Sequence, residues 1–208
     1  RSSAKEETEE TSVASEDLEE NAIETDVSSL SVGPFTGYSE ASGFPDPREA
    51  SPANIRDALR KIIKQDGPLT RASVYRLYVE GCPALQRAGK SVRQALDRAL
   101  GAMLRAGEIV QEDELRDGSP EGKALRLSGT PRVKVRPAGR RDLLEIPPSE
   151  LLAVLRLRHK AEILASEDND ALFRTVLKHY GFTQLTTSRK KYLSRVIQRA
   201  SSVEGGKS

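Results

Sequence analysis

A group of basic and amide side chains at positions 90–98 has the clearest chemical potential in this sequence. A helix predicted over residues 90–106 brings them to one side, and they are Lys90, Arg93, Gln94 and Arg98. Arginine can hydrogen-bond guanine with two donors, and glutamine can do the same with adenine. A lysine at a helix start can bind phosphate together with the free backbone amides there. This side of the helix is therefore a candidate nucleic-acid surface.

The same side also has a purely structural interpretation. A helix in a folded domain keeps one solvated side, and Arg and Gln are favourable helix formers. Asp97 lies in the middle of this side and would repel a phosphate group. Direct nucleic-acid contact and a structural or protein-binding role are both compatible with these residues.

Two further basic groups are candidates for contact with a phosphate backbone. The run "RVKVR" alternates apolar and basic residues, which predicts a strand with its basic side chains on the outer side. With the two arginines that follow in "GRR", this group is Arg132, Lys134, Arg136, Arg140 and Arg141. In the last predicted helix, Lys191 and Arg195 lie four residues apart. The structural alternatives are an edge strand protected by charge and a solvated helix side.

The sequence offers no set of residues for catalysis. His159 and His179 lie in basic segments without a carboxylate pattern beside them. The single cysteine, Cys82, has no histidine near it and excludes an internal disulfide and a multi-cysteine zinc site. "AGKS" at 88–91 resembles the end of a phosphate-binding loop, but position 84 is Ala where that loop requires Gly. We therefore expect no enzymatic activity, cofactor or metal in this segment.

The basic helix is the third of three that the sequence predicts. Ser51 and Pro52 are a favourable N-cap and first helical residue, and the run "DGP" ends that first helix. Thr70 can cap a second helix, which stops at Gly81. Apolar residues at helical spacing line one side of each helix.

A β-hairpin is predicted directly after the third helix. "EIVQ" and "KALRL" are short strands separated by the polar loop "EDELRDGSPEG". Three helices followed by a hairpin are the order of a winged helix, a helix-turn-helix variant whose recognition helix lies in the major groove. The loop begins "EDELRD", with four acidic residues, whereas a hairpin that grips phosphate would be basic. We expect this loop either to stay away from a DNA backbone or to contact a protein.

The predicted fold class is mainly α with a small β-hairpin: a winged helix-turn-helix followed by a helical C-terminal subdomain. The acidic tail is too poor in apolar residues to fold, and three aromatics near its end, Phe35, Tyr38 and Phe44, form either a docked strap or an ordinary linker. The predicted parts are a disordered acidic tail with its linker at 1–50, the winged helix at 51–137, the helical subdomain at 138–200 and a disordered tail at 201–208. Helices of the subdomain are expected to open at Pro147-Pro148, at Asp168 or Asp170, and at Ser188.

Charge divides the chain in similar places. Residues 1–50 hold 3 Lys or Arg against 13 Asp or Glu, residues 51–137 hold 17 against 10, and residues 138–208 hold 13 against 8. The net charges of −10, +7 and +5 describe an acidic tail and a basic body, and basic bodies commonly bind phosphate. The sequence contains no signal peptide and no run of apolar residues long enough for a membrane span, so we expect a cytoplasmic location.

Several turn and packing motifs resemble a known family. "DGPLT" after the first helix, "RAG" before the third and "LGAMLRAGEI" leading into the hairpin are similar to a winged-helix-like region of unknown function in large bacterial helicase-related proteins. "GRRDLLEIPPSELLAVL" and "DALFRTVLKHYGFTQLT" resemble its sequel, so the match covers roughly residues 50–200. In that family a superfamily 1 type ATPase core precedes this region, often with a restriction-endonuclease-like fold.

The resemblance implies a DNA-related context of unwinding, repair or defence against foreign DNA. It carries over no catalytic residue, because the ATPase and nuclease motifs lie outside this chain. Since residue 1 is Arg, we expect the chain to be a segment of a longer protein or a processed product. The leading hypothesis is an accessory DNA-binding region that holds duplex DNA largely without sequence specificity, with upstream ATPase domains as partners. The alternatives are a protein-interaction or scaffold module, which would use the aromatic strap and the acidic hairpin, and a transcriptional regulator.

Overall fold

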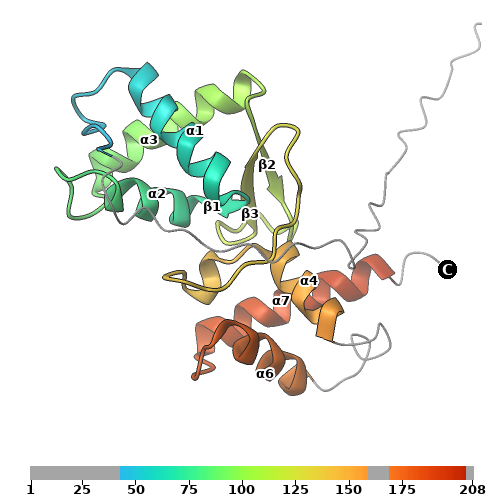
Figure 1. The fold of residues 1–208 in the computed structure, drawn as a ribbon. Coiled ribbons are helices and arrows are strands. Elements are labelled where there is room, and N and C mark those ends of the chain that lie inside the picture. Colours follow the sequence, from blue (N-terminus) through green and yellow to red (C-terminus); the bar gives the residue numbers. More distant parts are fainter. Residues whose placement is uncertain (1–42, 159–168, 205–208) are drawn as a thin grey trace, which may run out of the picture.

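The structure is a computed structural model that describes residues 43–158 and 169–204 (Figure 1). It is mainly helical with one small antiparallel sheet, which is the α+β class predicted from the sequence. The elements are α1 (Pro52–Asp66), β1 (Leu69–Thr70), α2 (Arg71–Glu80), α3 (Lys90–Arg105), β2 (Ile109–Asp113), β3 (Lys123–Leu127), the 3₁₀ turn η2 (Leu143–Glu145), α4 (Pro148–Arg158), α6 (Asn169–Tyr180) and α7 (Thr187–Glu204). None of these helices is long and apolar enough to cross a membrane.

Some predictions concern residues outside the described ranges. Among them are the acidic tail that was expected to be disordered and the aromatics Phe35 and Tyr38. A disordered tail was also predicted at 201–208, but residues 201–204 belong to α7, and only the last four residues lie outside the described ranges. His159 and Asp168, considered above as a catalytic candidate and as a helix cap, also lie outside the described residues.

The first helices begin where their capping residues predict. The Ser51 side chain accepts a hydrogen bond from the Asn54 amide at 3.3 Å, and Pro52 occupies the first turn of α1. Thr70 caps α2 in the same way, through the Ser73 amide at 3.3 Å. The end of α1 requires glycine at position 67, because a Cβ there would lie 2.4 Å from the backbone oxygen of Ile63.

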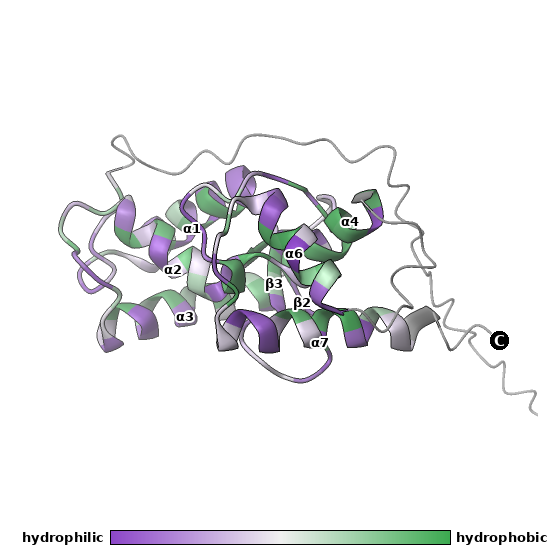
Figure 2. Ribbon diagram, turned by 90° about the horizontal axis from the view of Figure 1, so that it is seen from below, coloured by the Kyte–Doolittle hydropathy of each residue, from purple (hydrophilic) through white to green (hydrophobic). Residues whose placement is uncertain are grey.

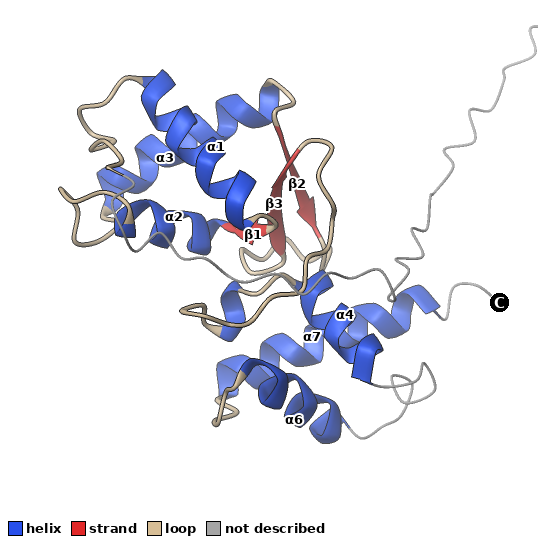
Figure 3. Cartoon of the chain, in the orientation of Figure 1, coloured by secondary structure: helices blue, strands red, loops and turns tan. Residues whose placement is uncertain are grey.

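The sheet contains one strand that the sequence did not reveal. Its order is β1-β3-β2 with both pairs antiparallel (Figure 3), and the two residues of β1 pair with Leu125 and Ala124 of β3. A strand of two residues is too short to produce an alternating pattern, which is why sequence analysis missed it. β2 also runs two residues beyond the predicted strand, because Glu112 and Asp113 pair with β3 despite their low strand propensity.

One hydrophobic core lies between α1, α2, α3 and the sheet. Phe44 of the aromatic linker belongs to this core, and its ring lies 5.3 Å from that of Tyr78. The backbone amide of Phe44 donates to Gly81 at 2.8 Å, and the Tyr78 hydroxyl donates to the Pro45 carbonyl at 2.9 Å. Phe44 therefore docks on α2, as expected for a strap.

A second core is formed by α4, α6 and α7. Hydropathy colouring shows apolar residues along the inner sides of these helices (Figure 2). The predicted apolar residues of α6 and α7 are all buried in this core: Leu172, Phe173, Val176, Leu177, Tyr180, Leu193, Val196 and Ile197. Two residues from the preceding part of the chain, Leu115 and Val135, also pack here.

The tip of the hairpin is docked on the C-terminal helices. Leu115 is only 7% exposed within the second core. Beside it, Glu114 accepts hydrogen bonds from the Ser149 amide and the Ser149 hydroxyl, both at 2.8 Å, at the start of α4. A carboxylate is favourable at this position because the first amides of a helix have no partner within the helix. The acidic hairpin thus contacts protein, and that protein is its own chain.

This docking predicts a stability effect for the Leu115→Ala variant. Removing the side chain from the second core should lower the free energy of unfolding by about 2–4 kcal/mol, measured by urea denaturation. The matched control is Leu157→Ala, because Leu157 is 43% exposed and its truncation should change stability by about 0.5 kcal/mol or less. Equal effects for the two variants would contradict the docked hairpin.

Candidate nucleic-acid interface

The outer side of α3 displays the four residues identified from the sequence. Lys90, Arg93, Gln94 and Arg98 are all exposed, while the opposite side of the helix packs in the first core. None of the four side chains makes an ion pair or a hydrogen bond within the described part of the chain. Their donors are therefore available to an external ligand.

A shallow depression lies at the start of α3. Its volume is about 480 Å³, and its lining comes from the α2–α3 connector and the first two turns of α3: Arg87, Ala88, Gly89, Lys90, Arg93, Gln94 and Asp97. The N-cap residue of α3, Gly89, has no side chain to bond the first amides of the helix. Those amides and the surrounding cations face an open surface, which suits an anionic ligand.

Asp97 is held by two neighbouring donors from α2. Arg71 of α2 donates to Oδ1 of Asp97 at 2.7 Å, and the Tyr75 hydroxyl donates to the same oxygen. Arg71 also donates to the Gln111 side chain of β2, at 2.8 and 3.0 Å. Burial, together with the Asp97 carboxylate, raises the pKa of Tyr75, so the hydroxyl remains a donor. The negative charge that argued against phosphate binding is thus compensated within the chain, and it links α2, α3 and β2.

The basic run after the hairpin is not a strand, so this prediction is wrong. Residues 131–142 are irregular, and consecutive residues turn inward: Val135 enters the second core and Arg136 is 0% exposed. Arg132 is exposed but pairs with Glu112 at 2.6 Å. The Lys134 amine donates to the Gln65 carbonyl at 3.4 Å.

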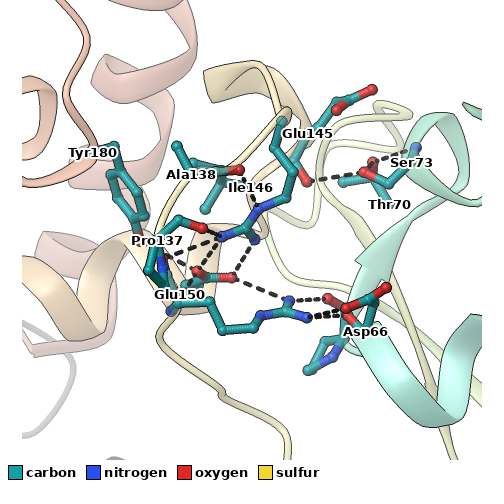
Figure 4. A network of polar contacts seen from close by, with 12 residues as sticks. Asp66, Thr70, Ser73, Pro137, Ala138, Glu145, Ile146, Glu150 and Tyr180 are labelled. Atoms are coloured by element: carbon teal, nitrogen blue, oxygen red, sulfur yellow. Dashed lines mark hydrogen bonds and ion pairs between the residues drawn. The ribbon is translucent and has the colours of Figure 1, made fainter. Parts of the chain in front are cut away.

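Arg136 and Arg141 are both buried, which overturns their expected contact with phosphate (Figure 4). Arg141 donates to both carboxylate oxygens of Glu150, at 2.8 and 2.9 Å. Arg136 donates to the Pro68 carbonyl at 3.0 Å and lies 3.5 Å from Glu150. The Tyr180 hydroxyl completes the group as a donor to Glu150 at 3.4 Å. These guanidiniums join the two parts of the molecule and are closed to a ligand. Arg140, between them in sequence, is exposed.

Asp66, at the end of α1, faces this network. It is 1% exposed, and within the described residues neither of its carboxylate oxygens accepts a hydrogen bond. The nearest cation is Arg136, whose Nη1 lies 3.9 Å from Oδ1. Burial raises the pKa of Asp66 from its ordinary value of 3.8 to about 6, and Arg136 only partly opposes this effect.

The two candidates on α7 have different environments. Lys191 is exposed and makes no ion pair within the described part of the chain. Arg195 instead binds the hairpin tip, through an ion pair with Asp117, a hydrogen bond to Ser119 and a longer contact of 3.8 Å to Glu121. Arg195 therefore positions the hairpin and is not a free phosphate ligand.

Sequence reasoning identified the exposed candidates and missed the groups that hold the site together. Arg71, Asp66 and Glu150 were not among the residues proposed from the sequence for the site. Local sequence patterns could not identify them, because the Asp97 partner of Arg71 lies 26 residues away and the Arg136 partner of Asp66 lies 70 residues away. Glu150 is closer to Arg136 and Arg141, at 14 and 9 residues, but neither arginine shares a helix or strand with it.

The environment of the single cysteine disfavours nucleophilic chemistry. Cys82 is buried, and burial raises the pKa of its thiol, which disfavours the reactive thiolate. No group of three or more metal-ligating side chains occurs among residues 43–158 and 169–204. The exposed cations and the amide of α3 can recognise a ligand by charge and hydrogen bonding.

The burial of Arg136 predicts a contrast between two arginines of one segment. Arg136→Met should lower the free energy of unfolding by about 3–5 kcal/mol, because Asp66 loses its nearest cation and two backbone carbonyls lose a donor. Arg140→Met, on the surface, should change it by about 0.5 kcal/mol or less. Urea denaturation of both variants checks this, and a neutral result for Arg136→Met would contradict its structural role.

Asp66 predicts a dependence of stability on pH. Between pH 3.8 and about 6 the folded chain keeps a proton on Asp66 that the unfolded chain has released. Unfolding then releases a proton, so this contribution to stability is lost as the pH rises through the window. The unfolding free energy of the unmodified chain minus that of Asp66→Asn should fall by up to about 3 kcal/mol between pH 4 and pH 7. Denaturation at stepwise pH measures this difference, and a constant value would show that Asp66 titrates normally.

Comparison with known proteins identifies no relative of this chain. No protein-family model matches it, and neither a curated protein nor a solved structure matches it significantly. The functional interpretation therefore depends on the geometry of α3 and its surroundings.

Proposed function

We propose that residues 51–137 form a winged helix that binds duplex DNA through α3. The order of elements supports this proposal: α1, β1, α2 and α3 are followed by the β2–β3 hairpin, with β1 paired to β3. In helix-turn-helix proteins the recognition helix enters the major groove with its N-terminal residues toward the bases. The depression and the exposed residues of α3 lie at that end.

One observation carries the proposal. Three cations and one amide are exposed together on α3, and the single carboxylate among them is already bound by Arg71 and Tyr75. Such a surface attracts phosphate and can donate to guanine and adenine edges. The candidate site consists of Lys90, Arg93, Gln94 and Arg98. Duplex RNA is a poorer ligand, because its narrow major groove does not admit a helix.

The wider role follows from the resemblance noted in the sequence. We propose that this region is an accessory module of a larger bacterial helicase-like ATPase, which holds duplex DNA largely without sequence specificity. Phosphate contacts supply most of the affinity of such binding. The protein-interaction alternative is weakened, because the groups it would use, Phe44 and the acidic hairpin, are engaged within the chain.

Charge reversal on α3 tests the proposal. The 208-residue chain should bind a labelled random duplex in fluorescence anisotropy, with an affinity that falls steeply with salt. Arg93→Glu combined with Arg98→Glu should weaken binding about 10- to 100-fold. The matched control is Arg174→Glu with Lys178→Glu on α6, which reverses two exposed charges on another helix and should retain most of the affinity. Unchanged affinity after reversal on α3 would refute this surface.

A further inference from the structure

We infer that α7 supplies a second contact for the same DNA, so that one duplex crosses from α3 over the docked hairpin to α7. This inference rests on the proposed function of α3. It names the form of the ligand, a duplex longer than one helical turn, and two further binding residues, Lys191 and Arg199.

The helices α3 and α7 lie on the same side of the molecule. In Figure 1 both lie behind their neighbours, α3 behind α1 and α7 behind α4 and α6. In Figure 2, which is turned by 90°, both lie along the lower edge, with α1, α4 and α6 above them. The two views agree, so the outer sides of α3 and α7 belong to one face.

Hydrogen bonds and an ion pair connect these two helices through the hairpin. At one end, Gln111 of β2 shares Arg71 with Asp97 of α3. At the other end, Asp117 and Ser119 in the hairpin loop are bound by Arg195 of α7. The face therefore continues from α3 across the hairpin to α7.

Three acidic groups of the hairpin have donors along this path. Glu112 pairs with Arg126 at 2.8 Å and with Arg132 at 2.6 Å. Glu114 is bound by Ser149, and Asp117 by Arg195. A duplex that crosses the hairpin thus meets carboxylates that already have donors, which reduces the repulsion expected from the sequence alone.

The accessible charge of α7 is positive on both sides of the hairpin contact, with Lys191 exposed and Arg199 half-buried. Lys191 and Arg199 lie one helical turn before and after Arg195, and neither makes an ion pair within the described residues. Residues 187–202 of α7 contain no Asp or Glu. A hairpin that grips DNA would itself be basic. In this protein the hairpin is acidic and docked on the C-terminal helices, so α7 beside it would supply the cations that bind the DNA backbone.

A comparison of two duplex lengths tests the inference in the full 208-residue chain. The probes are random duplexes of about 10 and about 24 base pairs, that is, about one and more than two helical turns. Lys191→Glu combined with Arg199→Glu should weaken binding of the longer duplex about tenfold and lower its salt slope by about 2. Binding of the shorter duplex should change by about twofold or less, because α3 alone can hold it. The control is again Arg174→Glu with Lys178→Glu, on α6, which lies above α7 and away from the lower edge in Figure 2.

The outcomes separate this inference from the proposed function. Loss confined to the longer duplex and to the α7 variant supports the second contact. If the α3 variant loses binding while the α7 variant binds both lengths like the unmodified chain, the α7 contact is wrong and the function of α3 stands. An equal loss in the α6 control would assign the effect to overall charge and also overturn the contact. If the unmodified chain binds neither duplex, both proposals fail.

Discussion

Two guanidinium groups are buried between the two cores, and the arrangement of the molecule depends on how their charges are neutralised. Arg141 is matched by a two-point contact with Glu150, and Arg136 by Glu150, Asp66 and backbone carbonyls from the end of α1. Buried charges without partners cost several kcal/mol, so few packings of the connecting segment can satisfy both arginines. This requirement fixes the end of α1 against the start of α4. It thereby sets how α3 is oriented relative to α7.

The helices were predictable because local signals agree with one another. Ser51, Thr70 and Gly67 mark ends that the structure retains, and apolar periodicity identified the buried sides. The segment at 132–136 was not predictable in the same way. Its alternation suggested a strand, but the burial of Arg136 needs Glu150 and Asp66, which a local pattern cannot reveal. The exposed candidates on α3 were found because a helix side follows from spacing alone, whereas the partners of Asp97 follow from tertiary structure.

The role of the acidic residues in the hairpin depends on the groups that they contact in the folded chain. The composition of the loop predicted that it either stays away from a DNA backbone or contacts a protein, and the structure shows a contact with protein. The partner is the C-terminal half of the same chain, through a helix start at Ser149 and the side chain of Arg195. The basic residues likewise fall into two groups, those with contacts inside the chain and those exposed to solvent. Arg136, Arg141 and Arg195 serve internal structure, and Lys90, Arg93 and Arg98 remain exposed.

The contact between the hairpin and α7 also sets an order of events during folding. Asp117 and Arg195 are separated by 78 residues, and Glu121 and Tyr192 by 71. Contacts between residues so distant in sequence form after local helices and turns, because closing a long loop costs chain entropy. On a ribosome, the three helices and the hairpin strands emerge well before α7. The hairpin loop therefore reaches its final position only after α7 has been synthesised.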